Sequence, residues 1–135
     1  MKIHHLGWLV KDIEKSVNAF KALMGGDLSV EEPVVDTDRL IKLVFVHSDI
    51  LCFEFIEPVS KESPVYEILK REGASLYHIC MEVEDIDMET DRMVKKGILL
   101  VHPKKPAVAI GNRNVAFLYD KNLGLVELVE TDSDR

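Results

Sequence analysis

The strongest constraint on the fold of this chain is an internal repeat, because two similar halves favour two copies of one structural module. The segment IHHLGWLVKDIEKSV, which starts at Ile3, aligns with LYHICMEVEDIDMET, which starts at Leu76. The segment VFVHSDILCFEFIE from Val44 resembles AFLYDKNLGLVELVE from Ala116, with one extra residue in the turn of the latter. The 135-residue chain therefore suits one domain assembled from two modules.

Each half reads as one strand, one helix and three further strands. Ile13, Val17, Phe20 and Met24 recur at helical spacing after Asp12, and Gly25-Gly26 is a typical helix end. Ser63-Pro64 is a typical start, and Gly73 a typical stop, for a short helix between the halves. Alternation of apolar residues predicts strands near 2–10, 28–32, 40–47 and 50–57, then 76–83, 98–103, 113–119 and 124–131, with the second helix near 86–96.

The expected fold class is therefore α+β. Two tandem βαβββ modules, about 1–58 and 74–132, are joined by a linker helix at about 59–73. We expect them to form one curled mixed sheet around a shared cleft, with the helices outside.

Four polar residues recur inside these apolar strands. His5 aligns with His78 and Glu54 aligns with Glu127, and the same spacing of 49 residues separates His5 from Glu54 and His78 from Glu127. A carboxylate inside an apolar strand is costly to bury without a cation. A lone strand histidine is most often structural and a lone strand glutamate most often faces solvent, but the recurrence favours one shared metal site. Two imidazoles and two carboxylates suit Ni, Co, Zn or Mn.

Composition excludes several classes of function. The net charge is −7 and no basic run exists, so the sequence gives little support for nucleic-acid binding. No stretch of about 20 apolar residues predicts a membrane span, and the N-terminus has no signal-peptide pattern. Cys52 and Cys80 each lie in an apolar run and are expected to be two buried thiols rather than a disulfide. We therefore expect a cytoplasmic protein.

The opening HHLGWLVKDIEKSV, the middle EFIEPVSKESPV, the LYHICMEVEDI segment and the closing VAFLYDKNLGLVELVE resemble the vicinal-oxygen-chelate superfamily, which includes glyoxalase I and methylmalonyl-CoA epimerase. The resemblance covers essentially the whole chain, and the middle block is most similar to methylmalonyl-CoA epimerases. It implies that His5, Glu54, His78 and Glu127 hold one divalent metal ion and that Glu127 also serves as a base.

Either Glu54 or Asp38 is expected to be the second base, and it is the resemblance that points to Asp38. Epimerases usually carry a glutamate, followed soon by glycine, before the strand that leads to the Glu54 position. Here Asp38 takes the place of that glutamate and Leu40 that of the glycine. The carboxylate is therefore shorter here and stands on a differently shaped loop.

The predicted function is metal-dependent proton transfer next to a carbonyl, most like that of methylmalonyl-CoA epimerase. A glyoxalase I type lyase acting on a thiol hemithioacetal is one alternative, and a non-catalytic drug-binding protein is another. A dioxygenase is disfavoured by the extra carboxylate of Glu54. Relatives are commonly dimeric, so a homodimer is expected. His4 is expected on the strand face away from the ligands, and Lys104, Lys105 and Arg113 are interpreted as solvated surface charges.

Overall fold

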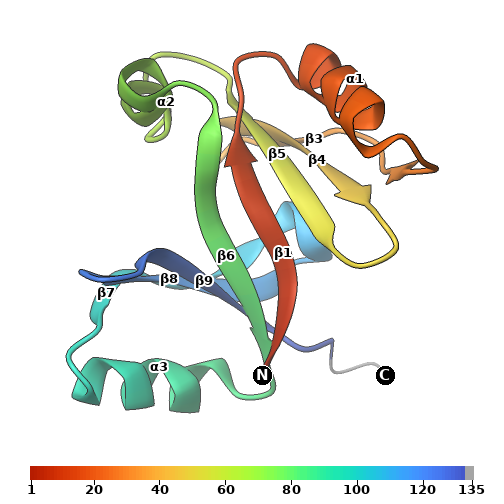
Figure 1. Cartoon of the computed structure of the whole chain (residues 1–135). Coiled ribbons are helices and arrows are strands. Elements are labelled where there is room, and N and C mark those ends of the chain that lie inside the picture. Colours follow the sequence, from red (N-terminus) through yellow and green to blue (C-terminus); the bar gives the residue numbers. More distant parts are fainter. Residues whose placement is uncertain (133–135) are drawn as a thin grey trace. The chain divides into compact units, whose positions relative to one another are not determined.

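Each half of the chain is one strand, one helix and then further strands, with an additional short strand in the first half, as the computed structural model shows for residues 1–132 (Figure 1). The chain divides into two compact units. One is Leu6–Tyr77; the other joins residues 1–5 to the chain from His78 onward. Each unit has a mixed sheet with a helix on one face. The predicted α+β class, with two βαβββ modules, is confirmed.

The Leu6–Tyr77 unit contains the end of β1 and a sheet in which β1 and β5 run parallel while β4 and β5 run antiparallel. The strands lie in the order β2-β4-β5-β1, and β3 pairs with β4. The elements are β1 (Lys2–Leu9), α1 (Ile13–Met24), β2 (Ser29–Val30), β3 (Val34–Asp36), β4 (Ile41–His47), β5 (Cys52–Pro58) and α2 (Tyr66–Glu72).

Local sequence signals explain where α1 begins and ends. The Asp12 carboxylate accepts a hydrogen bond from the Lys15 backbone N–H at 2.9 Å and so caps the helix. Gly25 ends it in a left-handed conformation, with φ of 65°, which glycine adopts without a Cβ clash. The apolar stripe of α1 then packs on the sheet, where Val17 and Phe20 join the buried cluster of Val10 and Phe55.

The second unit has the same plan. β6 and β9 run parallel, β9 and β8 antiparallel, and the strand order is β6-β9-β8-β7. Asp85 caps α3 as Asp12 caps α1, through a 2.9 Å bond from the Met88 backbone N–H. The elements are β6 (Ser75–Val83), α3 (Ile86–Lys95), β7 (Leu99–Ala107), the 3₁₀ turn η1 (Val108–Ile110), β8 (Arg113–Asp120) and β9 (Gly124–Glu130).

The two faces of this second sheet have different roles. On one face, Leu118 and Leu128 pack with Ile86 and Met93 of α3 into a buried core. Alternation along the strands sends the intervening residues to the other face, where Cys80 and Val129 form a smaller cluster. The face away from α3 is therefore the one that carries the polar strand residues described below.

The structure departs from the sequence prediction in three places. The strand predicted near 98–103 is β7 (Leu99–Ala107), which continues four residues further, with register shifts in its pairing with β8. The three-residue strand β3 was not predicted, because its segment follows Pro33 and runs into the polar turn at Asp36. The helix α2 begins at Tyr66 rather than next to Ser63-Pro64, and no side chain caps it. Ser63 instead accepts the Tyr66 backbone N–H through its carbonyl oxygen, in a turn that precedes the helix. No helix among the described residues is long and apolar enough to cross a membrane.

Candidate metal centre

Strand register places a histidine and a glutamate together on the open face of the second sheet. Cys80 of β6 lies opposite Glu127 of β9, and His78 stands two residues before Cys80, so its side chain leaves the sheet on the same face. Glu127 also pairs with Phe117 of β8. His5, from the first strand, belongs to the same unit and completes the group.

Three donor atoms of this group form a nearly regular triangle. His5 Nε2 and His78 Nε2 are 3.1 Å apart, and Glu127 Oε1 lies 3.0 Å from the first and 3.2 Å from the second. All three residues are buried, with relative exposures of 1% for His5, 7% for His78 and 6% for Glu127. The sequence prediction paired these residues across the repeat, and the structure brings them together.

The triangle fits a bound transition-metal ion. Ligand atoms about 2.1 Å from a metal stand about 3.0 Å apart on adjacent octahedral positions and about 3.4 Å apart in a tetrahedron. The observed edges of 3.0 to 3.2 Å lie nearer the octahedral value. Glu127 Oε1 is buried and, among the described residues, makes no hydrogen bond of good geometry, although two nitrogens stand close to it. Two imidazoles and a carboxylate that converge in this way are a donor set for such an ion.

The charge state of Glu127 follows from its neighbours. Burial raises the pKa of this carboxyl, but the adjacent imidazoles of His78 and His5 outweigh burial and hold the pKa well below its ordinary value. Glu127 is therefore a carboxylate at neutral pH. A buried carboxylate of this kind can bind a cation or accept a proton, but it has none of its own to donate.

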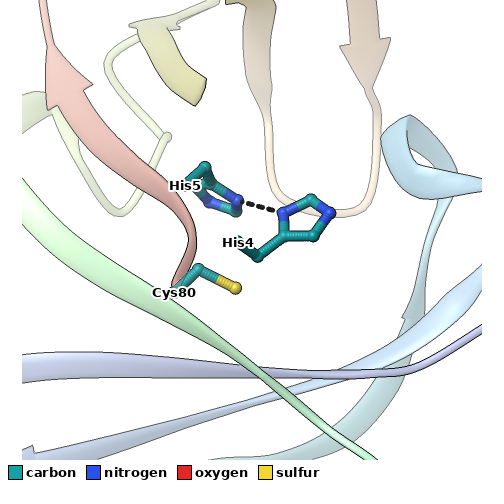
Figure 2. A group of neighbouring side chains, drawn as sticks. All are labelled: His4, His5 and Cys80. Carbon is teal, nitrogen blue, oxygen red and sulfur yellow. Dashed lines mark hydrogen bonds between the residues drawn. The ribbon is translucent and has the colours of Figure 1, made fainter. Parts of the chain in front are cut away.

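His5 is also held from its other side, by a residue that the sequence prediction placed on the opposite strand face. His4 Nδ1 lies 2.8 Å from His5 Nδ1, and Figure 2 shows the two rings turned toward each other. Arg113 Nη2 donates to His4 Nε2 at 2.8 Å. Burial, the adjacent His5 and the Arg113 guanidinium lower the pKa of His4 to about 4, so His4 is neutral and accepts this bond.

Arg113 is not the solvated surface charge that the sequence suggested. Its side chain is only 18% exposed, and besides His4 it donates to Glu82 Oε2 at 3.2 Å and to the Glu130 carbonyl oxygen at 3.2 Å. It lies 108 residues beyond His5 in the sequence, so no local pattern pointed to this contact. By contrast, Lys104 pairs with Asp87 and both side chains are substantially exposed, as expected for surface charges.

Cys80 lies near His4 and His5 and forms with them a second group of possible ligands (Figure 2). Burial raises the pKa of its thiol to about 12, so the sulfur is protonated at neutral pH. The Nδ1 atoms of His4 and His5 are engaged with each other in a 2.8 Å hydrogen bond. The group of His5, His78 and Glu127 is therefore the better candidate for a metal site, with Cys80 as a small buried neighbour.

An aromatic side chain bounds the site. The Phe117 ring meets the His78 ring edge-on, with centroids 5.6 Å apart, and meets the His102 ring in the same way at 5.9 Å. An apolar ring against a ligand histidine limits the access of water and helps to fix the orientation of the imidazole. Phe117 was not singled out from the sequence, where it is one of several apolar residues of a strand.

The remaining predicted residues lie in the Leu6–Tyr77 unit. Glu54 is 8% exposed and pairs in register with Gly7 of β1. Asp38 is exposed in the turn after β3. Leu40, which ends that turn, has φ of 54°, a left-handed conformation that favours glycine. The turn therefore keeps a backbone typical of glycine although leucine occupies the position.

Comparisons with known proteins identify the family and the fold. The profile of the Glyoxalase/Bleomycin resistance protein/Dioxygenase superfamily matches residues 4–117. A mitochondrial methylmalonyl-CoA epimerase of Dictyostelium discoideum is 28% identical over 132 residues, which cover 96% of this chain and 78% of that protein. An ethylmalonyl-CoA/methylmalonyl-CoA epimerase of Cereibacter sphaeroides is 26% identical over 130 residues, covering 94% and 96%. The crystal structure of methylmalonyl-CoA epimerase from Mycobacterium tuberculosis, 19% identical, has the same fold, with a TM-score of 0.85 over 98% of this chain and 89% of that one.

Proposed function

This chain belongs to the Glyoxalase/Bleomycin resistance protein/Dioxygenase superfamily, and on that premise we propose that it moves a proton at the carbon next to the carbonyl of an acyl-CoA, as a methylmalonyl-CoA epimerase. The observation that carries this proposal is the buried triangle of His5, His78 and Glu127. Support comes also from the similar proteins, which are named as epimerases of methylmalonyl-CoA.

We further propose Glu54 as the fourth metal ligand, from the register of the two parallel strand pairs. In the second unit Glu127 lies opposite Cys80, two residues after His78. In the first unit Glu54 lies opposite Gly7, two residues after His5 on the same strand. The two carboxylates therefore occupy equivalent positions in the repeat. The candidate metals are Ni, Co, Zn and Mn, and the triangle favours one that accepts octahedral coordination.

When bound, such a metal supplies a Lewis acid that stabilises negative charge on a substrate oxygen. The residues of the chain supply the rest. Glu127 is ionised and shielded from solvent, so it can take a proton from a substrate carbon held beside it. An epimerase must return a proton to the other face of that carbon, and Glu54 is the first candidate for this second base. Asp38 stays a candidate from the family resemblance, in an exposed turn.

The glyoxalase I type lyase is the second candidate function, because it uses the same donor set and the same proton transfer on a different substrate. A non-catalytic drug-binding protein is less well supported, since such a protein has no need for buried metal-ligating residues. The homodimer and the cytoplasmic location expected from the sequence stay predictions, and light scattering in solution tests the first of them.

The test is solvent deuterium exchange with the metal-stripped chain reloaded with Ni, Co, Zn or Mn. The epimerase proposal expects deuterium to enter methylmalonyl-CoA at the carbon between the thioester and the carboxylate. Formation of a lactoylthioester from methylglyoxal and a thiol, without that exchange, would move the assignment to the lyase. Glu127→Gln should abolish exchange with the fold intact, whereas Glu130→Gln is the matched control, because Glu130 alternates away from Glu127 on β9. Normal exchange in Glu127→Gln would refute its role as a base.

A further inference from the structure

A second set of possible metal ligands lies on the other side of His5 from the candidate metal centre. His5 presents Nε2 to His78 and Glu127, and Nδ1 to His4. Cys80 of β6 completes the second set, because one ligand atom each of His4, His5 and Cys80 lie within 4.8 Å of one another (Figure 2). All three residues belong to one compact unit of the chain. Only His5 is shared with the first centre.

The donor types of this second set differ from those of the first. The set consists of two imidazoles and one thiol, without a carboxylate. Two histidines and one cysteine around a trigonal ion are a donor set that proteins use for copper, and soft sulfur ligands favour copper in its monovalent state. The second set therefore favours a soft ion, whereas the first suits Ni, Co, Zn or Mn.

The spacing of the donor atoms suits three-coordinate binding. Ligand atoms about 2.0 to 2.3 Å from a metal stand about 3.5 to 3.8 Å apart when three of them surround it in one plane. The two Nδ1 atoms are 2.8 Å apart, so an ion between them replaces their hydrogen bond and moves the rings apart by about 1 Å or less. His4 is only partly buried, and its ring can make this movement. The sulfur, within 4.8 Å of both imidazoles, supplies the third ligand.

The charges around the set select a monovalent ion. Arg113 Nη2 lies 2.8 Å from His4 Nε2, so an ion held by His4 is close to a positive charge. Cys80 is fully buried in an apolar cluster with Val115 and Val129, where a net charge is costly. Copper(I) and one thiolate together form a neutral unit, whereas a divalent ion with the same ligands keeps a positive charge. A neutral unit is the one that this environment tolerates.

We propose that His4, His5 and Cys80 bind one copper(I) ion. On binding, the S–H bond of Cys80 breaks, the Cu–S bond forms and the proton passes to water, while copper keeps its oxidation state. His4 binds through Nδ1 and holds its proton on Nε2, so Arg113, which also donates there, releases that atom.

The shared residue makes the two sites compete. A neutral imidazole presents one lone pair, so His5 serves one ion at a time. Copper(I) should therefore displace a divalent ion from the candidate metal centre. This consequence rests on the proposed function, which includes that centre, whereas copper(I) binding itself does not depend on it.

The test titrates the metal-free full chain with copper(I) in the absence of oxygen, in competition with a copper(I) chelator of known affinity. We expect one ion per chain. Cys80→Ser removes the sulfur ligand and should weaken binding at least about 100-fold, since each ligand contributes a large share of the affinity of a metal site. Cys52→Ser is the matched control, because Cys52 is the other cysteine and lies in the Leu6–Tyr77 unit. Equal affinity in the two variants would overturn the proposal.

A further variant and a spectrum separate this site from the candidate metal centre. His78 belongs to that centre and not to the second set, so His78→Asn should bind copper(I) as the unaltered chain does. A loss as large as that in Cys80→Ser would place the ion at the first centre and overturn the proposal. X-ray absorption at the copper edge needs no variant, and it should show one sulfur and two nitrogen ligands. A spectrum without sulfur would also overturn the proposal.

Displacement of cobalt tests the shared use of His5. One equivalent of copper(I) is added to the chain loaded with Co²⁺, and the released Co²⁺ is measured after dialysis. Release is expected from the unaltered chain and from Cys52→Ser, but not from Cys80→Ser. Retention of Co²⁺ beside bound copper(I) would overturn the shared use of His5. If the chain binds no Co²⁺ at all, the proposed metal centre fails, while the copper(I) site stands on the titration.

Discussion

Replacing His4 with leucine should weaken binding of the divalent metal, although His4 is not one of its proposed ligands. His4 stands between Arg113 and His5, with a contact of 2.8 Å to each. Arginine can only donate, so His4 Nε2 accepts and its proton sits on Nδ1, directed at His5 Nδ1. The proton of His5 is then on Nε2, the atom that would bind the metal.

Metal binding to His5 Nε2 requires that this proton leave, because a ligating imidazole nitrogen must present a lone pair. Neutral His5 then carries its proton on Nδ1 and donates to His4. The His4 proton moves to Nε2, where it meets the Arg113 N–H, and two donors cannot share a 2.8 Å contact. We therefore expect Arg113 to turn away from His4 when the metal binds.

This reasoning gives two variants opposite effects. His4→Leu removes the partner that orients His5, and loss of such a partner typically costs 10- to 100-fold in metal affinity, or about 1.4 to 2.7 kcal/mol. Arg113→Met removes the competing donor and a positive charge near the site, so affinity should stay the same or increase. The opposite signs separate a role in orienting His5 from a general loss of stability.

The assay is competitive titration of the stripped chain with Co²⁺ or Zn²⁺ against a chelator of known affinity. His47→Leu is the control, since it removes an exposed histidine of the Leu6–Tyr77 unit that pairs with Glu31. Unchanged affinity in His4→Leu, or an equal loss in Arg113→Met, would refute the reasoning. Imidazole ¹⁵N shifts recorded with and without Zn²⁺ check the tautomers directly.

Three further predictions concern stability and reactivity. Folding lowers the pKa of His4 from 6.5 to about 4, so protonation of His4 favours the unfolded state. The unfolding free energy of the metal-free chain should therefore fall as the pH drops from 6.5 to 4. The expected loss is about 1 to 2 kcal/mol, after allowance for the partial exposure of His4. Denaturant unfolding of the unaltered chain and His4→Asn measures this, and an identical pH dependence in both would exclude His4 as the cause. Iodoacetamide at pH 8 should label Cys52 at least 10-fold faster than Cys80, because the buried thiol of Cys80 has a pKa of about 12. Mass spectrometry of peptides gives the two labelling rates. Equal rates would contradict the burial of Cys80. Phe20→Ala should lower the unfolding free energy by about 3 to 5 kcal/mol, because the Phe20 ring is buried among Trp8 and Phe55. A loss below about 1 kcal/mol would mean that α1 is not packed as described.

The sequence predicted the fold well because its signals are local and occur twice. Asp12 and Asp85 mark the starts of α1 and α3, and each accepts the backbone N–H three residues on. Alternation along β1 places Trp8 and Val10 on the same strand face, and both pack in the cluster under α1. The start of α2 was wrong because Ser63-Pro64 forms a separate turn, which the same residue types also favour.

The sequence predicted which residues gather at the candidate site but not what surrounds them. His5, His78 and Glu127 were found because the repeat doubles a pattern that would mean little alone. His4 was assigned to the opposite face by strict alternation, yet its ring reaches the edge of the His5 ring. Arg113 and Phe117 approach the histidines only through the pairing of distant strands, and nothing near them in sequence specifies that pairing.

The most direct test of the central claim is titration of the stripped chain with Co²⁺, followed by calorimetry and visible absorption. The account predicts one ion bound per chain, with the weak absorption of an octahedral site. It also predicts loss of that binding in His78→Asn and Glu127→Gln, while the surface variant His47→Leu binds normally. Absence of binding by the unaltered chain, or equal binding by His78→Asn, would contradict the assignment of His5, His78 and Glu127 as a metal centre.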